Sequence, residues 1–446
     1  MKAFLLSAQP VVSFQKHYNF GGTDEGYCVE QTIDHGYIIT GRLTNGGGDS
    51  KIVLQKVDSS GQTQWYKVFG GPYDNIAYSV KQTTDGGYIL AGYTSNSSYA
   101  QFVYLIKTDG NGDTLWTKRN LTPHIPTVPS VYGAIGYYVA QTNDGGYALT
   151  ARYVDSDSTG VIMFIKTNSS GDTLWTKKLK KSFGLVGGCF QQSADSTYII
   201  AGKAWTAISP SNTYNILILK LNPVGDTIWT KLLHTTTNNE TVYSIQKTTD
   251  GGYFLSGVIA FTSTLKTDAY IVKTNSTGDT LWTRKIGGSG NDGVQSGQQT
   301  SDGGYVMVGL TTSYGAGADD VYLVKTDNSG NVSWFKTFGG VNNDYGDFVQ
   351  QTKDHGYIIS GFTASFGSGD IYLIKTDSTG YAIATGINEL HSMNSVLIYP
   401  NPMESSAEII LNHKFDGTCL FEVFDPLGRC VKRIEGIKEQ QFTFLR

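Results

Sequence analysis

The stretch QTTDGGYILAG, residues 82–92, decides the fold. Close variants recur as QTNDGGYALTA at 141–151, KTTDGGYFLSG at 247–257, QTSDGGYVMVG at 299–309 and QTKDHGYIISG at 351–361. The tyrosine after the turn marks seven copies, at Tyr37, Tyr88, Tyr147, Tyr198, Tyr253, Tyr305 and Tyr357. Successive copies lie about 50–60 residues apart, a period that is typical of a propeller or a solenoid.

Each copy reads as four short strands. In the second copy these are YSVKQTT (78–84), YILAGYT (88–94), VYLIKTD (103–109) and TLWTK (114–118). The intervening turns are rich in glycine, which supplies the positive φ that a tight hairpin needs. Four antiparallel strands per copy predict an all-β, seven-bladed propeller. A β-solenoid is the weaker reading, because its coils are usually shorter and parallel.

A tryptophan marks the fourth strand of six copies, at Trp65, Trp116, Trp175, Trp229, Trp282 and Trp334. The seventh copy has Tyr381, Ala382 and Ile383 there instead. The N-terminal piece SFQKHYNFGG, residues 13–22, resembles a fourth strand with Phe14 in the tryptophan position. We therefore expect residues 12–20 to complete the seventh blade, which closes the ring and removes its open edge.

Composition and charge exclude several classes of function. The formal net charge is -4 and 16% of residues are charged, so nothing favours nucleic acid or an anionic membrane as a partner. The sequence contains no run of about 20 apolar residues, so it predicts no membrane-spanning helix. The four cysteines give no disulfide framework: Cys28 and Cys189 fall in separate copies, and the spacing of Cys419 and Cys430 does not by itself pair them.

The repeat is similar to WD-like blades and to the delta-60 type of bacterial repeat, which share the DG-hydrophobic-G second strand and the later glycine turn. This resemblance covers roughly residues 13–385 and implies the fold.

The segment VLIYPNPMESSAEIILNHKFDGTCLFEVFDPLGRCVKRIEG, residues 396–436, resembles the type A sorting domain of the type IX secretion system. Tyr399, Pro400, Asn401 and Pro402 match its opening motif, and FEVFDPLGRCVKRI matches its central hairpin. That family implies export across the outer membrane of Bacteroidetes-type bacteria, then removal of the tail and release or surface anchoring.

The domain organisation follows from these segments. Residues 1–12, MKAFLLSAQPVV, resemble the remnant of a signal peptide whose apolar core is shorter than the usual 7–15 residues. The propeller takes residues 13–385, and residues 386–393 form a linker. Residues 394–446 are expected to form a small partial β-sandwich, the sorting domain, incomplete because the family's last strands are missing.

Five side chains are candidates for ligand contact. Trp205 is the only tryptophan outside the repeat position, in a long loop of the fourth blade, where an exposed ring could stack on a sugar. Tyr73 and Tyr314 lie in loops predicted on the same face of the ring. Arg42 and Arg152 share a repeat position at the exit of the second strand. For each candidate, the alternative is a structural role without ligand contact: a side chain packed on its own loop or solvated at a strand end.

The repeated aspartates and lysines read as structure. Each copy carries an aspartate in its first turn and a lysine at the end of its third strand, and seven identical copies favour an ion pair within each blade over catalysis. Asp24, Asp74, Asp292 and Asp344 enter the next blade and read as turn caps, with a cation or sugar as the alternative. TDGNGDTLW, residues 108–116, lacks the glycine and the bidentate acid of a calcium loop. His35 and His355 lack a third ligand, so we expect no metal and no cofactor.

We expect a secreted or outer-membrane-surface propeller, monomeric and non-enzymatic, that presents loops to a glycan or a surface protein. Its C-terminal domain would engage the type IX secretion machinery. Two alternatives stay open. One is a carbohydrate-active hydrolase or lyase, which would need paired carboxylates or an arginine cluster at the mouth of the central channel. The other is a structural surface protein without a specific ligand.

Overall fold

The computed structural model describes residues 13–44, 48–119, 121, 133–154, 160–179, 185–206, 213–233, 238–383, 396–399, 406–411, 419–424, 430–437 and 441–445. The chain divides into two compact units, Met1–Ala384 and Thr385–Arg446. Every regular element in the described ranges is a β-strand. No helix in this part of the chain is long and apolar enough to cross a membrane.

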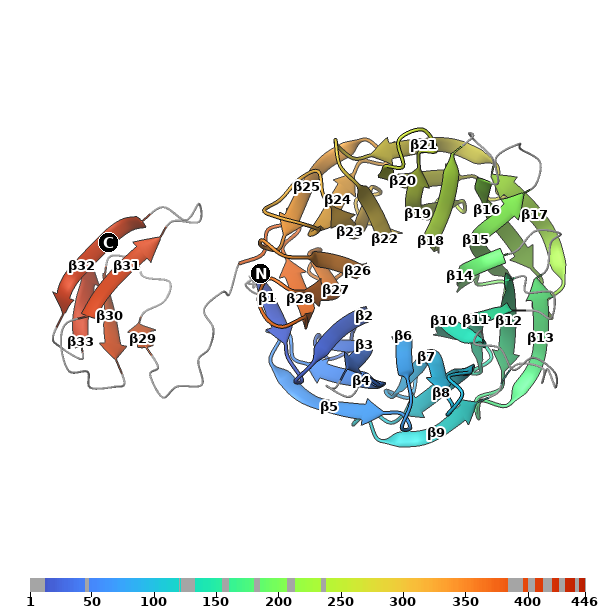
Figure 1. The fold of residues 1–446 in the computed structure, drawn as a ribbon, viewed down its shortest axis with the longest axis horizontal. Coiled ribbons are helices and arrows are strands. Elements are labelled where there is room, and N and C mark those ends of the chain that lie inside the picture. The colour runs from blue at the N-terminus through green and yellow to red at the C-terminus, as the bar shows by residue number, and fades with distance from the viewer. Residues whose placement is uncertain are drawn as a thin grey trace, which may run out of the picture. The chain divides into compact units, whose positions relative to one another are not determined.

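The first unit is a ring of seven four-stranded antiparallel blades, as predicted (Figure 1). Each blade runs outward from the centre of the ring in chain order. The first three blades are β2 (Thr23–Gln31), β3 (Tyr37–Thr44), β4 (Ser50–Val57), β5 (Thr63–Phe69); β6 (Asn75–Gln82), β7 (Tyr88–Ser95), β8 (Gln101–Thr108), β9 (Thr114–Arg119); and β10 (Ile135–Gln141), β11 (Tyr147–Val154), β12 (Gly160–Thr167), β13 (Thr173–Leu179).

The remaining blades keep the same order. They are β14 (Leu185–Gln192), β15 (Tyr198–Thr206), β16 (Thr213–Leu221), β17 (Thr227–Leu233); β18 (Asn239–Lys247), β19 (Tyr253–Ala260), β20 (Thr267–Thr274), β21 (Thr280–Ile286); β22 (Asp292–Gln299), β23 (Tyr305–Thr311), β24 (Asp320–Thr326), β25 (Val332–Phe338); and β26 (Asp344–Gln351), β27 (Tyr357–Thr363), β28 (Asp370–Thr376), with β1 (Phe14–Tyr18) on the outside.

The N-terminal strand closes the ring. β1 pairs antiparallel with β28, and Phe14 lies opposite Lys375 as Trp65 lies opposite Lys56 in the first blade. The Phe14 side chain is buried and meets the ring of Tyr37 edge-on at 6.4 Å. The seventh blade is therefore built from both ends of the propeller sequence, so β28 is covered like the third strand of every other blade.

The repeated tryptophans pack between blades. Each one contacts the repeat tyrosine of the following blade, with ring centroids 5.7–6.4 Å apart: Trp65–Tyr88, Trp116–Tyr147, Trp175–Tyr198, Trp229–Tyr253, Trp282–Tyr305 and Trp334–Tyr357. The tyrosines are buried. The conserved spacing of the repeat thus encodes the contact that stacks one blade on the next.

Glutamine side chains join the blades near the centre. The side-chain oxygen of the glutamine that ends an innermost strand accepts the backbone N–H of the first turn in the preceding blade, at 2.8–3.0 Å. These glutamines are Gln31, Gln82, Gln141, Gln192, Gln299 and Gln351. Gln31 makes this bond to the N–H of Lys353, so the seam between the last and first blades is joined like the others.

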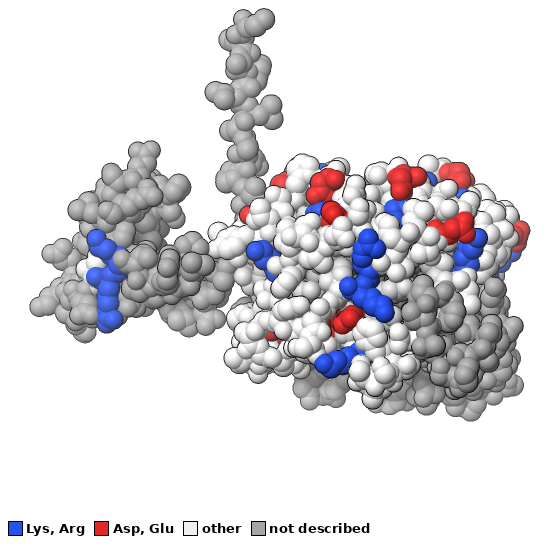
Figure 2. Space-filling model, turned by 90° about the horizontal axis from the view of Figure 1, so that it is seen from above, with Lys and Arg blue, Asp and Glu red and all other residues white. Residues whose placement is uncertain are grey.

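Six of the seven predicted aspartate–lysine pairs form ion pairs within their blades. The distance from Nζ to the carboxylate is 2.8–2.9 Å in Lys56–Asp34, Lys107–Asp85, Lys166–Asp144, Lys273–Asp250, Lys325–Asp302 and Lys375–Asp354. The lysines are buried, and the aspartates lie at the turns of one face of the ring. Figure 2 shows acidic side chains gathered along one side of the propeller, with basic ones beside and below them.

The glycine of the second turn makes room for the tryptophan of the preceding blade. Gly112 has φ +79°, and a Cβ there would lie 2.6 Å from Cζ3 of Trp65. Gly86, in the first turn of the same blade, also has a positive φ of +82°, but a Cβ there would meet nothing within 4 Å. The two glycines share the backbone requirement and differ only in the contact.

We therefore predict that Gly112→Ala destabilises the propeller more than Gly86→Ala. The positive φ alone costs about 1–2 kcal/mol for alanine, and overpacking against Trp65 adds about 1–3 kcal/mol. Denaturant unfolding of the two variants measures the difference. Equal losses would show that the Trp65 contact does not limit the position.

The second unit contains two small sheets. β29 (Val396–Tyr399), β30 (Ser406–Leu411) and β33 (Gln441–Leu445) form one, and β31 (Cys419–Phe424) pairs antiparallel with β32 (Cys430–Ile437) in the other. The β31–β32 pair lies where the central hairpin is predicted. Tyr399 ends β29, whereas Pro400, Asn401, Pro402 and the linker 386–393 lie outside the described residues.

Candidate functional site

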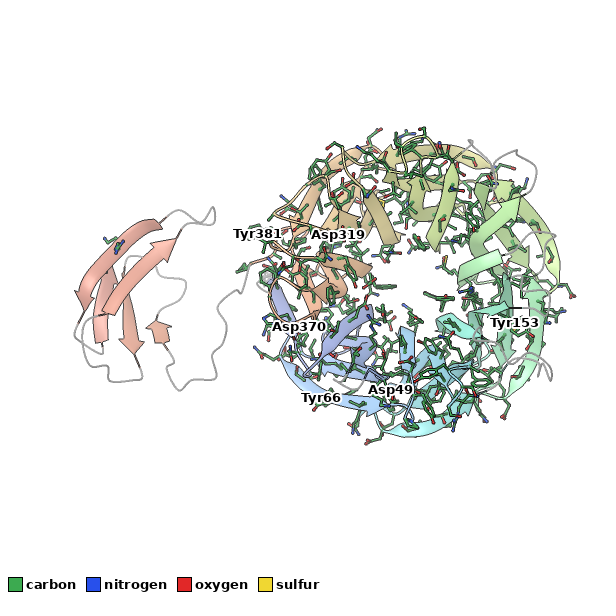
Figure 3. All side chains as sticks on the ribbon, in the orientation of Figure 1. Asp49, Tyr66, Tyr153, Asp319, Asp370 and Tyr381 are labelled. Carbon is green, nitrogen blue, oxygen red and sulfur yellow. The ribbon has the colours of Figure 1, made fainter. Side chains whose placement is uncertain are left out.

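The innermost strands of the seven blades surround the centre of the ring (Figure 1), and their side chains project around an open middle (Figure 3). Each innermost strand has a bulge at one repeat position, where the pairing with the second strand shifts. The bulged residues are Tyr27, Tyr78, Tyr137, Gly187 with Gly188, Tyr243, Gln295 and Asp347. Because a bulge re-aims its side chain and locally ends the pairing, this position sets what lines the axis.

Glu25 lies on β2, two residues before the bulged Tyr27, and three side chains contact its carboxylate. The hydroxyl of Tyr27 donates to Oε2 at 2.6 Å, and that of Tyr345, from the seventh blade, donates to Oε1 at 2.9 Å. Nε of Arg42 lies 3.0 Å from Oε2. The carboxylate is buried, yet both of its oxygens have partners, so this network compensates its charge.

Asp347 lies beside this network without such compensation. Its Oδ2 is shielded from solvent and has no hydrogen-bond partner. Burial raises the pKa of Asp347 well above its ordinary value, the Glu25 carboxylate raises it further, and Arg42 offsets part of both effects. A carboxyl group in this setting favours its protonated form.

Three of the bulged tyrosines form a series across neighbouring blades. The ring centroids of Tyr27 and Tyr78 are 4.9 Å apart, and those of Tyr78 and Tyr137 are 5.4 Å apart. Tyr93, from the second strand of the same blade as Tyr78, adds a contact at 6.4 Å. All three bulged tyrosines are half-buried, so each keeps part of its surface free.

We call the group formed by Glu25, Tyr27, Arg42, Tyr78, Tyr137, Tyr345 and Asp347 the axial cluster. It comes from blades seven, one, two and three. At the same positions, blade five, across the axis from blade two, and blade six, beside blade seven, present Tyr243 and Gln295 at the bulge and Val258 and Leu310 at the position of Arg42. Unlike the Asp–Lys pairs, which recur in six blades, the axial cluster brings different side chains together once, as a binding site requires.

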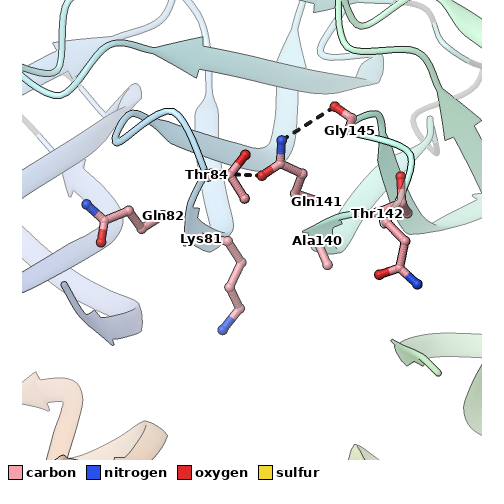
Figure 4. Close-up of a pocket in the computed structure, with 8 residues that line it drawn as sticks. Lys81, Gln82, Thr84, Ala140, Gln141, Thr142 and Gly145 are labelled. Carbon is pink, nitrogen blue, oxygen red and sulfur yellow. Dashed lines mark hydrogen bonds between the residues drawn. The ribbon is translucent and has the colours of Figure 1, made fainter. Parts of the chain in front are cut away.

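A polar pocket of about 430 Å³ lies between blades two and three, close to the first turns (Figure 4). It is lined by Lys81, Gln82, Thr84, Ala140, Gln141, Thr142, Asn143 and Gly145. Ala140 stands where other blades carry Gln191, Gln246 or Gln350, and those glutamines bond the N–H of the next blade. The short alanine leaves the space.

The groups around that pocket are already engaged. The Gln141 amide bonds to the N–H of Thr84 and to the carbonyl of Gly145 (Figure 4). Lys81 Nζ lies 3.4 Å from Glu30 and over the rings of Tyr138 and Phe348, at 5.9 Å and 5.4 Å. Burial would lower the pKa of Lys81, but Tyr138 and Glu30 raise it, so the ammonium stays charged and neutralised in place. The axial cluster is therefore the stronger candidate.

Comparisons with known proteins locate the fold. No protein-family model matches the sequence, and no curated protein matches it. Among solved structures the chain is similar to a puromycin hydrolase, with 13% identity and a TM-score of 0.54 over 87% of this chain and 58% of that one. It is also similar to a protein of unknown function from Dyadobacter fermentans (13% identity, TM-score 0.43, 67% and 93% of the chains). An alpha-L-arabinanase from Penicillium chrysogenum, complexed with arabinobiose, gives 10% identity and a TM-score of 0.43 over 68% and 93%.

These comparisons bear on architecture only. At this level of identity the hydrolase shares the fold and nothing more, and the chain spans about 58% of its length. The functional argument rests on this chain's own residues.

Arg42 is the one predicted contact residue that belongs to the axial cluster. Arg152 lies on β11 and faces blade four: burial lowers the pKa of Lys203 on β15, and the nearby Arg152 charge lowers it further. Lys203 also lies over the ring of Tyr214, at 4.7 Å. The structure therefore shows no joint arginine cluster of Arg42 and Arg152 among its described contacts.

The three predicted aromatic residues are apart from this cluster. Trp205 is on β15, where its backbone pairs with Tyr214, so the loop is shorter than predicted; the Trp205 side chain lies outside the described part of the protein. Tyr73 meets Tyr99 edge-on at 6.2 Å. Tyr314 packs against Tyr322 and Phe335, with centroids 5.9 Å and 4.6 Å away. Tyr73 and Tyr314 thus pack locally on separate blades.

The predicted turn caps at the entry to the blades are present. Oδ2 of Asp24, Asp292 and Asp344 accepts the backbone N–H four residues earlier, at 2.6–2.9 Å, and Asp74 accepts the N–H of Ser50. Asp24, Asp292 and Asp344 lie on the first residues of innermost strands rather than in loops. No group of three or more potential metal-binding side chains occurs among the described residues.

Sequence reasoning missed Glu25, Tyr27, Tyr78, Tyr137, Tyr345 and Asp347. A signal was present in the repeat itself. Four copies carry tyrosine at the bulge, and Asp347 is the one acidic residue at that position. Departures from the repeat, rather than the repeat, mark the site.

Proposed function

We propose that this protein is a secreted, non-enzymatic binding propeller whose ligand, a glycan or a surface protein, inserts a group at the axial cluster. The single observation that carries the proposal is the convergence of unlike side chains on one side of the axis. Rigid strands position these side chains, so binding requires little ordering of the protein. Half-exposed tyrosine faces beside hydrogen-bonding carboxyls suit a ligand that has both flat apolar surface and polar groups.

Export by the type IX secretion system is part of the proposal. It rests on the resemblance of residues 396–436 to the type A sorting domain. Replacing Tyr399 to Pro402 by alanine in the producing bacterium is the direct test, because the protein should then be retained inside the cell envelope. Unchanged appearance outside the cell would refute this part and leave the binding proposal intact.

The binding proposal predicts that Tyr78→Ala weakens retention on the protein's ligand about five-fold or more, since stacking on a ring contributes about 1–3 kcal/mol. The full-length chain is passed over a panel of polysaccharides and immobilised surface proteins. Tyr243→Ala, at the same bulge on the opposite side of the axis, is the matched control and should bind normally. Retention that is equal in both variants would remove the axial cluster from the binding site.

A carbohydrate-active enzyme is the second candidate, favoured by one observation. Burial raises the pKa of Asp347, whereas the neighbouring Glu25 accepts bonds from two tyrosine hydroxyls and lies beside Arg42, and two carboxyls in unlike environments are what acid–base hydrolysis needs. The same panel decides between the two functions. Sugar released by the native chain and abolished in Asp347→Asn would establish the enzyme; retention without release would support the binding role.

A further inference from the structure

Asp347 is the only acidic side chain at a bulge of the innermost strands, and its Oδ2 is buried without a hydrogen-bond partner. Its neighbours of opposite charge are few. The charged and titratable side chains that affect it are Glu25 and Arg42, and it in turn affects Tyr345. Arg42 lies closer to Glu25, with Nε 3.0 Å from Oε2, and offsets only part of the effect of burial on Asp347.

The neighbouring surface is aromatic. Tyr27 occupies the bulge of the next blade, and Tyr78 and Tyr137 continue the series at 4.9 Å and 5.4 Å between centroids. The π-face of a tyrosine attracts a cation that comes within about 6 Å of the ring centre. A carboxyl without a counter-ion therefore stands at one end of a row of such faces.

We propose that the group inserted at the axial cluster is cationic, an ammonium that pairs with Asp347 and lies against the faces of Tyr27 and Tyr78. This inference rests on the proposed binding function and specifies the chemistry of its ligand. An ammonium provides the donors that Oδ2 of Asp347 lacks and stabilises its ionised form. An anion would instead face both Glu25 and Asp347, and a neutral group would give Asp347 no reason to ionise.

Two sources supply the same chemistry: the amino group of a deacetylated amino sugar and the side chain of a lysine in a protein. Each has a matched neutral form. Chitosan tetramer is compared with chitin tetramer, and a lysine-containing peptide with its Nε-acetylated form. Binding to the full-length chain is measured by titration calorimetry at pH 7 in two buffers with different ionisation enthalpies.

We expect at least one free amine to bind ten-fold or more tightly than its acetylated form. Binding of the lysine peptide should release a proton, because its ammonium is already charged at pH 7 and Asp347 ionises as it enters, and this release appears as a buffer-dependent enthalpy. Asp347→Asn should lose the preference for the amine and the proton release. Tyr243→Ala, at the same bulge in blade five across the axis, should keep both.

Folding is checked in each variant by thermal melting; Asp347→Asn removes a desolvated carboxyl and should melt no lower than the native chain. Equal affinity for free and acetylated ligands, with the Tyr78 dependence retained, would overturn the cationic ligand and leave the proposed binding function standing. Loss of binding by Tyr243→Ala but not by Tyr78→Ala, or no binding of any of the four ligands, would overturn the cationic inference. Continued Tyr78-dependent retention of another ligand would still support the binding function.

Discussion

Removal of residues 1–20 is expected to abolish cooperative folding of the propeller or to lower its melting temperature by about 10 °C or more. The deletion takes away β1, and with it the five residue pairs that join Phe14–Tyr18 to β28. It uncovers the space of the buried Phe14 and breaks the bond from the Tyr18 hydroxyl to the carbonyl of Gly61, at 2.6 Å. Loss of a buried phenylalanine alone costs about 3–5 kcal/mol, within a net stability of about 5–15 kcal/mol for a typical domain.

The reason for so large an effect is topological. Phe14 packs on Tyr37 and against Gly61 of blade one, so β1 belongs to blade seven by hydrogen bonding and to blade one by packing. Without it, β28 becomes an exposed edge that can pair with another chain. Deletion of residues 1–11 is the control and should melt as the native chain does. Phe14→Ala should reproduce much of the loss, and an unchanged melting curve after removal of residues 1–20 would show that the other seam contacts suffice.

The fold could be predicted because its determinants are local and repeated. The turn glycines, the tryptophan positions and the Asp–Lys pairs each recur with the blade, and each acts within a blade or on the next one. Even the closing strand was visible, since Phe14 occupies a position that six tryptophans define. Physical requirements that are identical seven times leave a periodic trace in the sequence.

The site could not be predicted in the same way because it depends on which blades are neighbours across the seam. Glu25 and Tyr345 are far apart in the sequence and are joined only when blade seven meets blade one. The bulge that aims Asp347 directly follows Gly346, but this chain has 54 glycines, so a glycine alone does not single out the position. Sequence reasoning favoured loops and an exposed tryptophan, whereas the structure favours the innermost strands, where Arg42 alone had been noticed.

Acid is expected to destabilise the propeller chiefly between about pH 4 and pH 2. Burial alone would raise the pKa of Asp34, Asp85, Asp144, Asp250 and Asp302, but bonds from the paired lysine and the neighbouring threonine lower each pKa to about 2. An unfolded aspartate has a pKa of about 3.9. Because the folded value is the lower one, this contribution to stability is complete above the unfolded pKa and is lost as the pH falls towards the folded one.

The size of the effect follows from exposure and repetition. These aspartate side chains are 53–62% exposed, so screening by solvent limits each pair to about 0.5–1 kcal/mol. Five such pairs together contribute about 3–5 kcal/mol. Urea unfolding at several pH values measures this, and Asp85→Asn should reduce the acid-dependent loss by roughly one fifth. A main loss between pH 7 and pH 5 would contradict the assignment.

Other carboxyls work in the opposite direction, so stability should peak in mildly acidic solution. Burial raises the pKa of Asp24, Asp268, Asp320 and Asp347. Their folded values exceed the unfolded ones, and stability therefore falls as the pH rises from the unfolded value towards the folded value. Asp347→Asn should reduce the loss of unfolding free energy above the pH of maximum stability. It should leave the loss at lower pH unchanged, because Asp347 takes no part in the lysine pairs. If Asp347→Asn instead changed stability only below the pH of maximum stability, Asp347 would already be paired with a cation in the free protein. The axial cluster would then have no unpaired carboxyl to offer a ligand.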